Sequence, residues 1–150
     1  MVQVQAPVST GRGVPQNQPQ PPSKILVVED SYPVMEAMSC TLEGLGYHVV
    51  RASDGMEALD QFDKENPDLV VLDLKLPVVS GFRLLQIFKG GAFGRKVPVI
   101  VVTAMDFEEA EEVARTGADD FLTKPFNFDL FARKVQFMLS QKSRYAAQRR

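Results

Sequence analysis

Between residues 24 and 141, five short apolar segments alternate with five segments of helical periodicity. Such alternation is typical of a parallel sheet that is covered by helices on both faces. The expected strands are Ile25–Val28, His48–Ala52, Leu69–Asp73, Val97–Thr103 and Asp120–Leu122. Because the first, third and fourth are continuous runs rich in Val, Ile and Leu, we expect them to be central strands, with the other two more peripheral. The pattern predicts an α/β fold.

Three of the intervening segments carry apolar side chains at clear helical spacing. They lie within residues 34–45, 56–62 and 82–88. The fourth helix, expected at Glu108–Thr116, has only two alanines and Val113 to bury, so it should be weakly anchored. The fifth should be firmly docked, because two phenylalanines, a valine and a methionine recur between residues 128 and 138. Glycines at 46, 90, 91 and 117 lie where left-handed helix caps are expected.

The two ends of the chain differ in composition from the middle. Residues 1–23 contain five Pro, five Gln and a single charged residue, which predicts a disordered Pro/Gln-rich leader, with a proline-rich ligand as the alternative. Residues 24–141 form the expected domain and hold 12 basic and 19 acidic residues, a formal charge of −7. Residues 142–150 are a basic tail. An acidic domain does not favour binding to nucleic acid.

Several classes of protein are disfavoured by what the sequence lacks. No apolar run reaches the roughly 18 residues of a membrane span, and the first residues do not resemble a secretory signal, so the cytoplasm is the expected location. The lone cysteine, Cys40, excludes a disulfide within the chain and is expected to be a small buried hydrophobe. The only histidine, His48, is expected to be a half-buried structural residue.

Polar side chains collect where the expected strands end. The first strand is followed by Glu29 and Asp30, the third ends in Asp73, the fourth ends in Thr103, and Lys124 follows the fifth. Ligands of open α/β sheets bind at the carboxyl ends of the strands, so these groups should converge. Three clustered carboxylates repel one another unless a hard cation neutralises them, which predicts a site for Mg²⁺ or Mn²⁺.

The same constellation fits phosphoryl transfer to a carboxylate. Asp73 is the natural acceptor, because it stands between the acidic pair on one side and Thr103 and Lys124 on the other. Phosphoryl transfer is accelerated mainly by positioning and by neutralising charge on the equatorial oxygens, for which a hydroxyl and an ammonium are suited. Alone, Asp73 would be read as a solvated carboxylate at a strand end, and the acidic pair as anions at a helix N-terminus.

Four motifs together resemble the receiver domains of two-component response regulators. They are ILVVEDS (25–31), VVLDLKLP (70–77), VVTA (101–104) and GADDFLTKPF (117–126). The resemblance implies a flavodoxin-like, doubly wound five-stranded parallel sheet with strand order 2-1-3-4-5 and five helices. It also implies a cis peptide between Lys124 and Pro125.

The resemblance further implies roles for individual residues. Asp73 would be the phosphoacceptor, Asp30 and Asp73 with the Lys75 carbonyl would hold the metal, and Glu29 would act through water. Thr103 and Lys124 would bind the phosphoryl oxygens. Phe121 would be the aromatic that changes rotamer on phosphorylation, unless it is a plain core residue. Apart from the resemblance, hydrolysis of an aspartyl phosphate needs a water aligned behind phosphorus, and the side chains of Lys75 and Met105 are placed to orient or block it. Neither is a carboxylate or an amide, so slow self-dephosphorylation is expected, with a solvent-facing Lys75 as the alternative for that residue.

The expected function is therefore a signal relay rather than an enzyme acting on other substrates. A sensor histidine kinase or a histidine phosphotransfer protein would phosphorylate Asp73, and a conformational change would reach an unknown output, with a phosphorylation-dependent dimer as one outcome. Two alternatives stay open: a phosphatase-like enzyme with an aspartyl-phosphate intermediate, and a scaffold that is never phosphorylated. The acidic run from Asp106 to Glu112 is either a solvated face or a partner surface.

Overall fold

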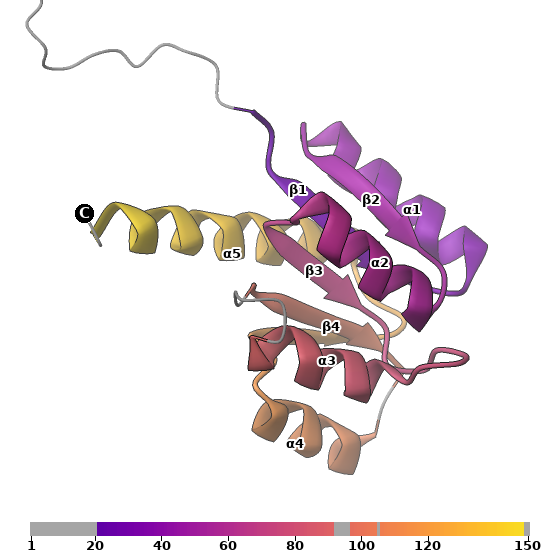
Figure 1. Ribbon diagram of the computed structural model, residues 1–150. Coiled ribbons are helices and arrows are strands. Elements are labelled where there is room, and N and C mark those ends of the chain that lie inside the picture. The colour runs from indigo at the N-terminus through magenta and orange to yellow at the C-terminus, as the bar shows by residue number, and fades with distance from the viewer. Residues whose placement is uncertain (1–20, 92–96, 105, 149–150) are drawn as a thin grey trace, which may run out of the picture.

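The computed structural model describes residues 21–91, 97–104 and 106–148 of the chain (Figure 1). Its strands are β1 (Lys24–Val28), β2 (His48–Ala52), β3 (Leu69–Leu72), β4 (Val99–Thr103) and β5 (Asp120–Thr123). Its helices are α1 (Tyr32–Gly44), α2 (Gly55–Glu65), α3 (Gly81–Gly90), α4 (Phe107–Thr116) and α5 (Phe128–Gln148). The expected strands therefore form within two residues of their predicted bounds, and the expected fourth helix begins one residue earlier.

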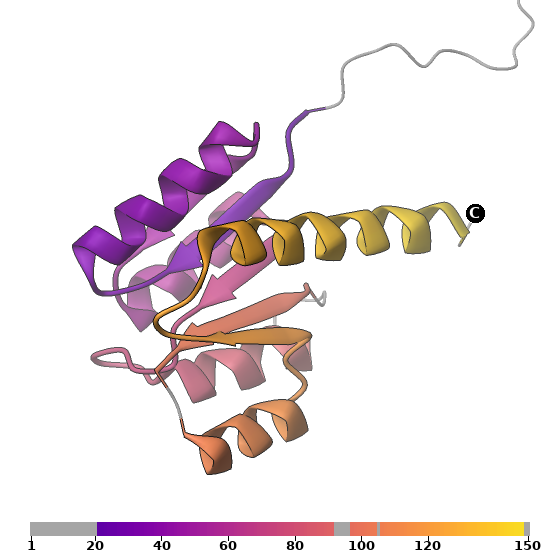
Figure 2. The same cartoon turned by 180° about the vertical axis from the view of Figure 1, so that it is seen from behind.

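The strands form one parallel sheet in the order β2-β1-β3-β4-β5, which confirms the predicted fold class and strand order. Side chains alternate between the two faces of each strand. In β1, Ile25 and Val27 face the cluster formed with α1 and α5, whereas Leu26 and Val28 face the cluster formed with α2 and α3. Figures 1 and 2 show these helix layers from opposite sides. Burial on both faces explains why the central strands read as continuous apolar runs.

Helix ends follow the local sequence. Asp54 and Ser80 cap α2 and α3 by accepting from the backbone N–H three residues on, and Asp106 caps α4 in a capping box with Glu109. Gly91 and Gly117 end α3 and α4 in the left-handed region, as predicted. The N-terminal caps therefore fix where α2, α3 and α4 begin.

Two predictions about single side chains were wrong. Cys40 is exposed, because the buried stripe of α1 passes through Met38, Ser39 and Leu42 and leaves residue 40 on the outer side. His48 is also exposed, since it is the first residue of the edge strand β2, whose buried positions begin at Val49. An apolar neighbourhood in sequence did not reveal the rotational phase of the helix or the end of the strand.

The C-terminal helix α5 continues to Gln148, beyond the expected domain boundary at residue 141, and extends past the sheet (Figure 2). Across the described part of the chain, no helix has the length and apolar character needed to cross a bilayer. The expected leader falls on residues of which 1–20 lie outside the described ranges.

Candidate functional site

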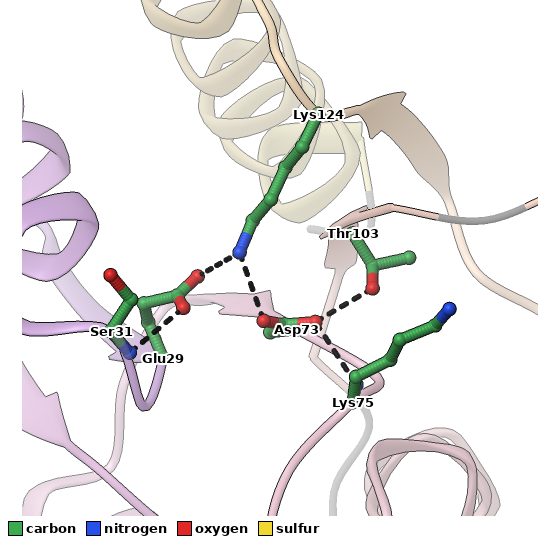
Figure 3. A network of polar contacts seen from close by, with 6 residues as sticks. All are labelled: Glu29, Ser31, Asp73, Lys75, Thr103 and Lys124. Atoms are coloured by element: carbon green, nitrogen blue, oxygen red, sulfur yellow. Dashed lines mark hydrogen bonds and ion pairs between the residues drawn. The ribbon is translucent and has the colours of Figure 1, made fainter.

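The carboxylate of Asp73 is the centre of a hydrogen-bonded cluster at the carboxyl end of the sheet (Figure 3). Its Oδ1 accepts from the Thr103 hydroxyl at 2.7 Å and from the Lys75 backbone N–H at 3.0 Å. Its Oδ2 accepts from the Lys124 ammonium at 3.0 Å. Asp73 is 4% exposed, so these three donors replace most of the water that a surface carboxylate would have.

Lys124 joins two buried carboxylates. Its Nζ lies 2.8 Å from Glu29 Oε1 as well as 3.0 Å from Asp73 Oδ2. Burial alone lowers the pKa of Lys124, but hydrogen bonds to Glu29 and Asp73 outweigh it, and the net pKa is raised. The ammonium is therefore charged and held between the strand ends.

Burial raises the pKa of Glu29, and the nearby negative charge of Asp73 raises it further. Hydrogen bonds from Lys124 and from the Ser31 backbone N–H act in the opposite direction without cancelling the rise. The ionised form of a buried carboxylate that lies beside a second carboxylate is stabilised by any positive charge added nearby.

Three acidic residues lie close enough together that they could hold a metal ion. One carboxylate oxygen from each of Glu29, Asp30 and Asp73 lies within 4.8 Å of the others. Asp30 is exposed while the other two are buried, so the cluster opens to solvent at one side. An all-oxygen donor set suits Mg²⁺ or Mn²⁺, and the Lys75 peptide is held next to the site by its N–H bond to Asp73.

The loop that follows Asp73 depends on residues that sequence reasoning did not single out. The N–H of Gly81 donates to the Leu74 carbonyl at 3.0 Å, and a Cβ at position 81 would lie 2.3 Å from Leu74 Cα. Only glycine permits this closure. At the tip, Val78 adopts φ 72° and is 80% exposed, within a turn closed by the Val79 N–H and the Pro77 carbonyl at 2.9 Å. This is an uncommon backbone conformation for a β-branched residue.

The structure does not bring every predicted residue into the cluster. Phe121 lies on the edge strand β5 and is 40% exposed. The Lys75 side chain runs away from Asp73 (Figure 3), and its ammonium lies 3.9 Å from Glu109 on α4, a contact that sequence reasoning missed. Met105 lies outside the described residues. The Lys124–Pro125 peptide is cis, as predicted.

Comparisons with known proteins agree with this geometry. The family model for the response regulator receiver domain matches residues 25–136. The phosphate regulon transcriptional regulatory protein PhoB of Klebsiella pneumoniae is 42% identical over 106 residues, which cover 69% of this chain and 46% of that protein. This chain thus spans about half the length of such relatives.

Two solved structures are similar throughout the fold. A CheY-like response regulator receiver protein from Methanospirillum hungatei has a TM-score of 0.76 at 27% identity, covering 83% of this chain and 98% of that one. The receiver domain of the sensor histidine kinase PA1611 from Pseudomonas aeruginosa, solved with magnesium in its active site cleft, has a TM-score of 0.72 at 29% identity, covering 79% and 98%. The chain belongs to the family of response regulator receiver domains.

Proposed function

We propose that Asp73 is the phosphoacceptor of this receiver. The observation that carries the proposal is the buried Asp73 carboxylate, which accepts hydrogen bonds from Thr103, Lys124 and the Lys75 backbone beside two further carboxylates. A carboxylate is a known covalent nucleophile for phosphoryl groups. Its oxygen would attack phosphorus while the bond between phosphorus and the donor breaks, giving an aspartyl phosphate.

The residues around Asp73 have distinct roles in this proposal. The Thr103 hydroxyl, released from the carboxylate, would donate to a phosphoryl oxygen, and the Lys124 ammonium would neutralise part of the transferred charge. Asp30, Asp73 and the Lys75 carbonyl would hold Mg²⁺ or Mn²⁺, with Glu29 acting through a water molecule. When bound, the metal supplies charge neutralisation for the transferring group.

We further propose that the phosphoryl group comes from a phosphohistidine of a sensor histidine kinase or of a phosphotransfer protein, in the cytoplasm. A second copy of the phosphorylated receiver is one candidate partner. Relatives such as PhoB are named transcriptional regulatory proteins, and this chain spans only about half their length. The domain formed by residues 24–141 has a net negative charge and would not itself bind nucleic acid.

The division into a leader (1–23), a receiver (24–141) and a basic tail (142–150) also stays a proposal. The helix α5 spans the last boundary, so the tail would continue the receiver's own helix in its first part. Phe121, at the exposed edge of the sheet, would be the aromatic that changes rotamer when Thr103 moves. Lys75 and Met105 would set how long the phosphoryl group persists.

A phosphatase-like reaction makes a different prediction from a receiver. An enzyme with an aspartyl-phosphate intermediate hydrolyses many equivalents of a phosphomonoester, and it needs an acid or base near the nucleophile to pass protons. Here the residue two positions after Asp73 is Lys75, whose side chain points toward α4 instead. Incubation with Mg²⁺ and excess p-nitrophenyl phosphate tests the point. We expect no sustained release of p-nitrophenol, and continuous multiple turnover would replace the receiver proposal with the phosphatase one.

A further inference from the structure

The side chain of Lys75 connects the Asp73 loop to the first turn of α4. Its backbone N–H donates to Asp73 Oδ1 at 3.0 Å, but its Nζ points away from that carboxylate (Figure 3). The Nζ lies 3.9 Å from Glu109 Oε2. The Lys75 side chain is 59% exposed, so water and salt screen the pair and the ammonium is free to change partners. Lys75 thus contacts the site through its backbone and α4 through its side-chain ammonium.

The partner carboxylate, unlike the ammonium, is fixed in place. Glu109 Oε2 accepts from the Asp106 backbone N–H at 2.9 Å, and the Glu109 backbone N–H donates to Asp106 Oδ1 at 2.9 Å. This capping box satisfies two backbone N–H groups at the start of α4. Glu109 is therefore built into the helix start and is not simply one member of a solvated acidic face.

We infer that Glu109 is a positioning residue for Lys75, which holds the ammonium away from a phosphoryl group on Asp73 and so shortens the lifetime of that group. The inference rests on Asp73 being phosphorylated. A phosphoryl group carries a charge of about −1.5 to −2 and attracts any free ammonium nearby. Glu109 competes for the same ammonium with its own negative charge.

The competition has a direction. Without the charge of Glu109, Lys75 would turn toward the phosphoryl oxygens, and its four-carbon stem would cover the approach of the attacking water. Hydrolysis needs that water aligned behind phosphorus, so it should slow. The coupling is reciprocal, because a phosphoryl group that draws Lys75 away from Glu109 also removes a contact from the start of α4.

The test variant is Glu109→Gln, because glutamine also serves at this position of a capping box and removes only the charge. The protein is phosphorylated with acetyl phosphate and Mg²⁺, the donor is removed, and loss of the phosphorylated mass is followed. At low salt we expect the phosphoryl group to be lost about two- to threefold more slowly than in wild type, which corresponds to the energy of an exposed ion pair. The difference should shrink at about 0.5–1 M NaCl, because the Debye length there falls to a few ångströms. In a Lys75→Met background the substitution should have no effect on the rate.

Two controls separate positioning from helix stability. Glu108→Gln removes the same charge from the neighbouring exposed residue and should leave the rate unchanged, and thermal unfolding should be similar for all variants. Equal or faster loss in Glu109→Gln, or slower loss that persists without Lys75, would overturn the inference. If wild type never gains phosphoryl mass, the proposed function itself fails, which is a distinguishable outcome.

Discussion

The helices α1 and α4 follow strand ends that carry site residues, yet they are attached to the sheet very differently. Four side chains of α1 are buried: Met35, Met38, Ser39 and Leu42. Among the described side chains of α4 only Val113 is fully buried. The acidic pair before α1 is thus fixed by a packed helix, whereas Thr103 leads into a helix that can shift at low cost. In the proposed switch, the side of the site that carries the acidic pair would stay fixed, and the side that carries Thr103 would move on phosphorylation.

The polar contacts of the two sides differ in the same way. Lys124 is enclosed with Glu29 and Asp73, and breaking such a buried arrangement leaves an uncompensated charge. The ion pair between Lys75 and Glu109 is largely exposed and longer, at 3.9 Å, so it contributes little to stability. The buried contacts hold the site residues in place, whereas the charge of one phosphoryl group is enough to rearrange the exposed ion pair.

The largest expected effect is on stability, in a pair of core variants. Leu42→Ala should lower the free energy of unfolding by about 2–5 kcal/mol, because Leu42 is fully buried in the cluster that α1 forms with the sheet and α5. Val113→Ala should lower it by only about 1–2 kcal/mol while raising amide exchange within α4, since two methyl groups are lost from a locally anchored helix. Urea unfolding and hydrogen exchange measure both. Equal losses of stability would contradict the comparison.

The metal side should depend on Asp30. Asp30→Ala removes one of three clustered carboxylates, so we expect Mg²⁺ affinity to fall by at least about tenfold and phosphorylation to fall with it. Calorimetric titration gives the affinity, and Asp63→Ala, an exposed acid on α2, is the matched control. An unchanged affinity for Mg²⁺ would remove Asp30 from the metal site.

The movable side should respond to a phosphoryl mimic. With Mg²⁺ and beryllofluoride, amide exchange should change by about threefold or more in α4, β5 and the start of α5, because Thr103 is drawn toward the ligand and the segment after it follows. The amides of α1 beyond its first turn should change less. A response confined to the residues around Asp30 and Asp73 would show that α4 does not carry the signal.

The smallest expected effect concerns a buried serine on α1. Ser39 is fully buried, and its hydroxyl has no hydrogen-bond partner among the described residues. Removing an unsatisfied buried hydroxyl relieves its desolvation cost, so Ser39→Ala should raise the free energy of unfolding by about 0.5–1 kcal/mol. Chemical denaturation measures the change, with Ser140→Ala as an exposed control. Destabilisation would mean that the hydroxyl has a partner in solution.

Sequence patterns predicted the sheet and the central cluster, because parallel strands end at one edge and bring Asp73, Thr103 and Lys124 together whatever the loops do. They failed for Cys40, whose exposure depends on the phase of α1. The contact between Lys75 and Glu109 joins residues 34 positions apart through two flexible side chains, and no periodicity encodes it. The glycine at 81 was also missed, since its need comes from the path of a neighbouring backbone.

Phosphorylation of Asp73 can be read directly from the intact mass of the protein. Wild type and Asp73→Asn are incubated with Mg²⁺ and acetyl phosphate, and intact mass is recorded. The isosteric amide keeps the shape of the carboxylate but is a poor nucleophile. We predict a mass gain of one phosphoryl group, about 80 Da, in wild type only. Wild type should show no such gain when Mg²⁺ is chelated before the donor is added. The same gain in Asp73→Asn, or no gain in wild type, would contradict the account.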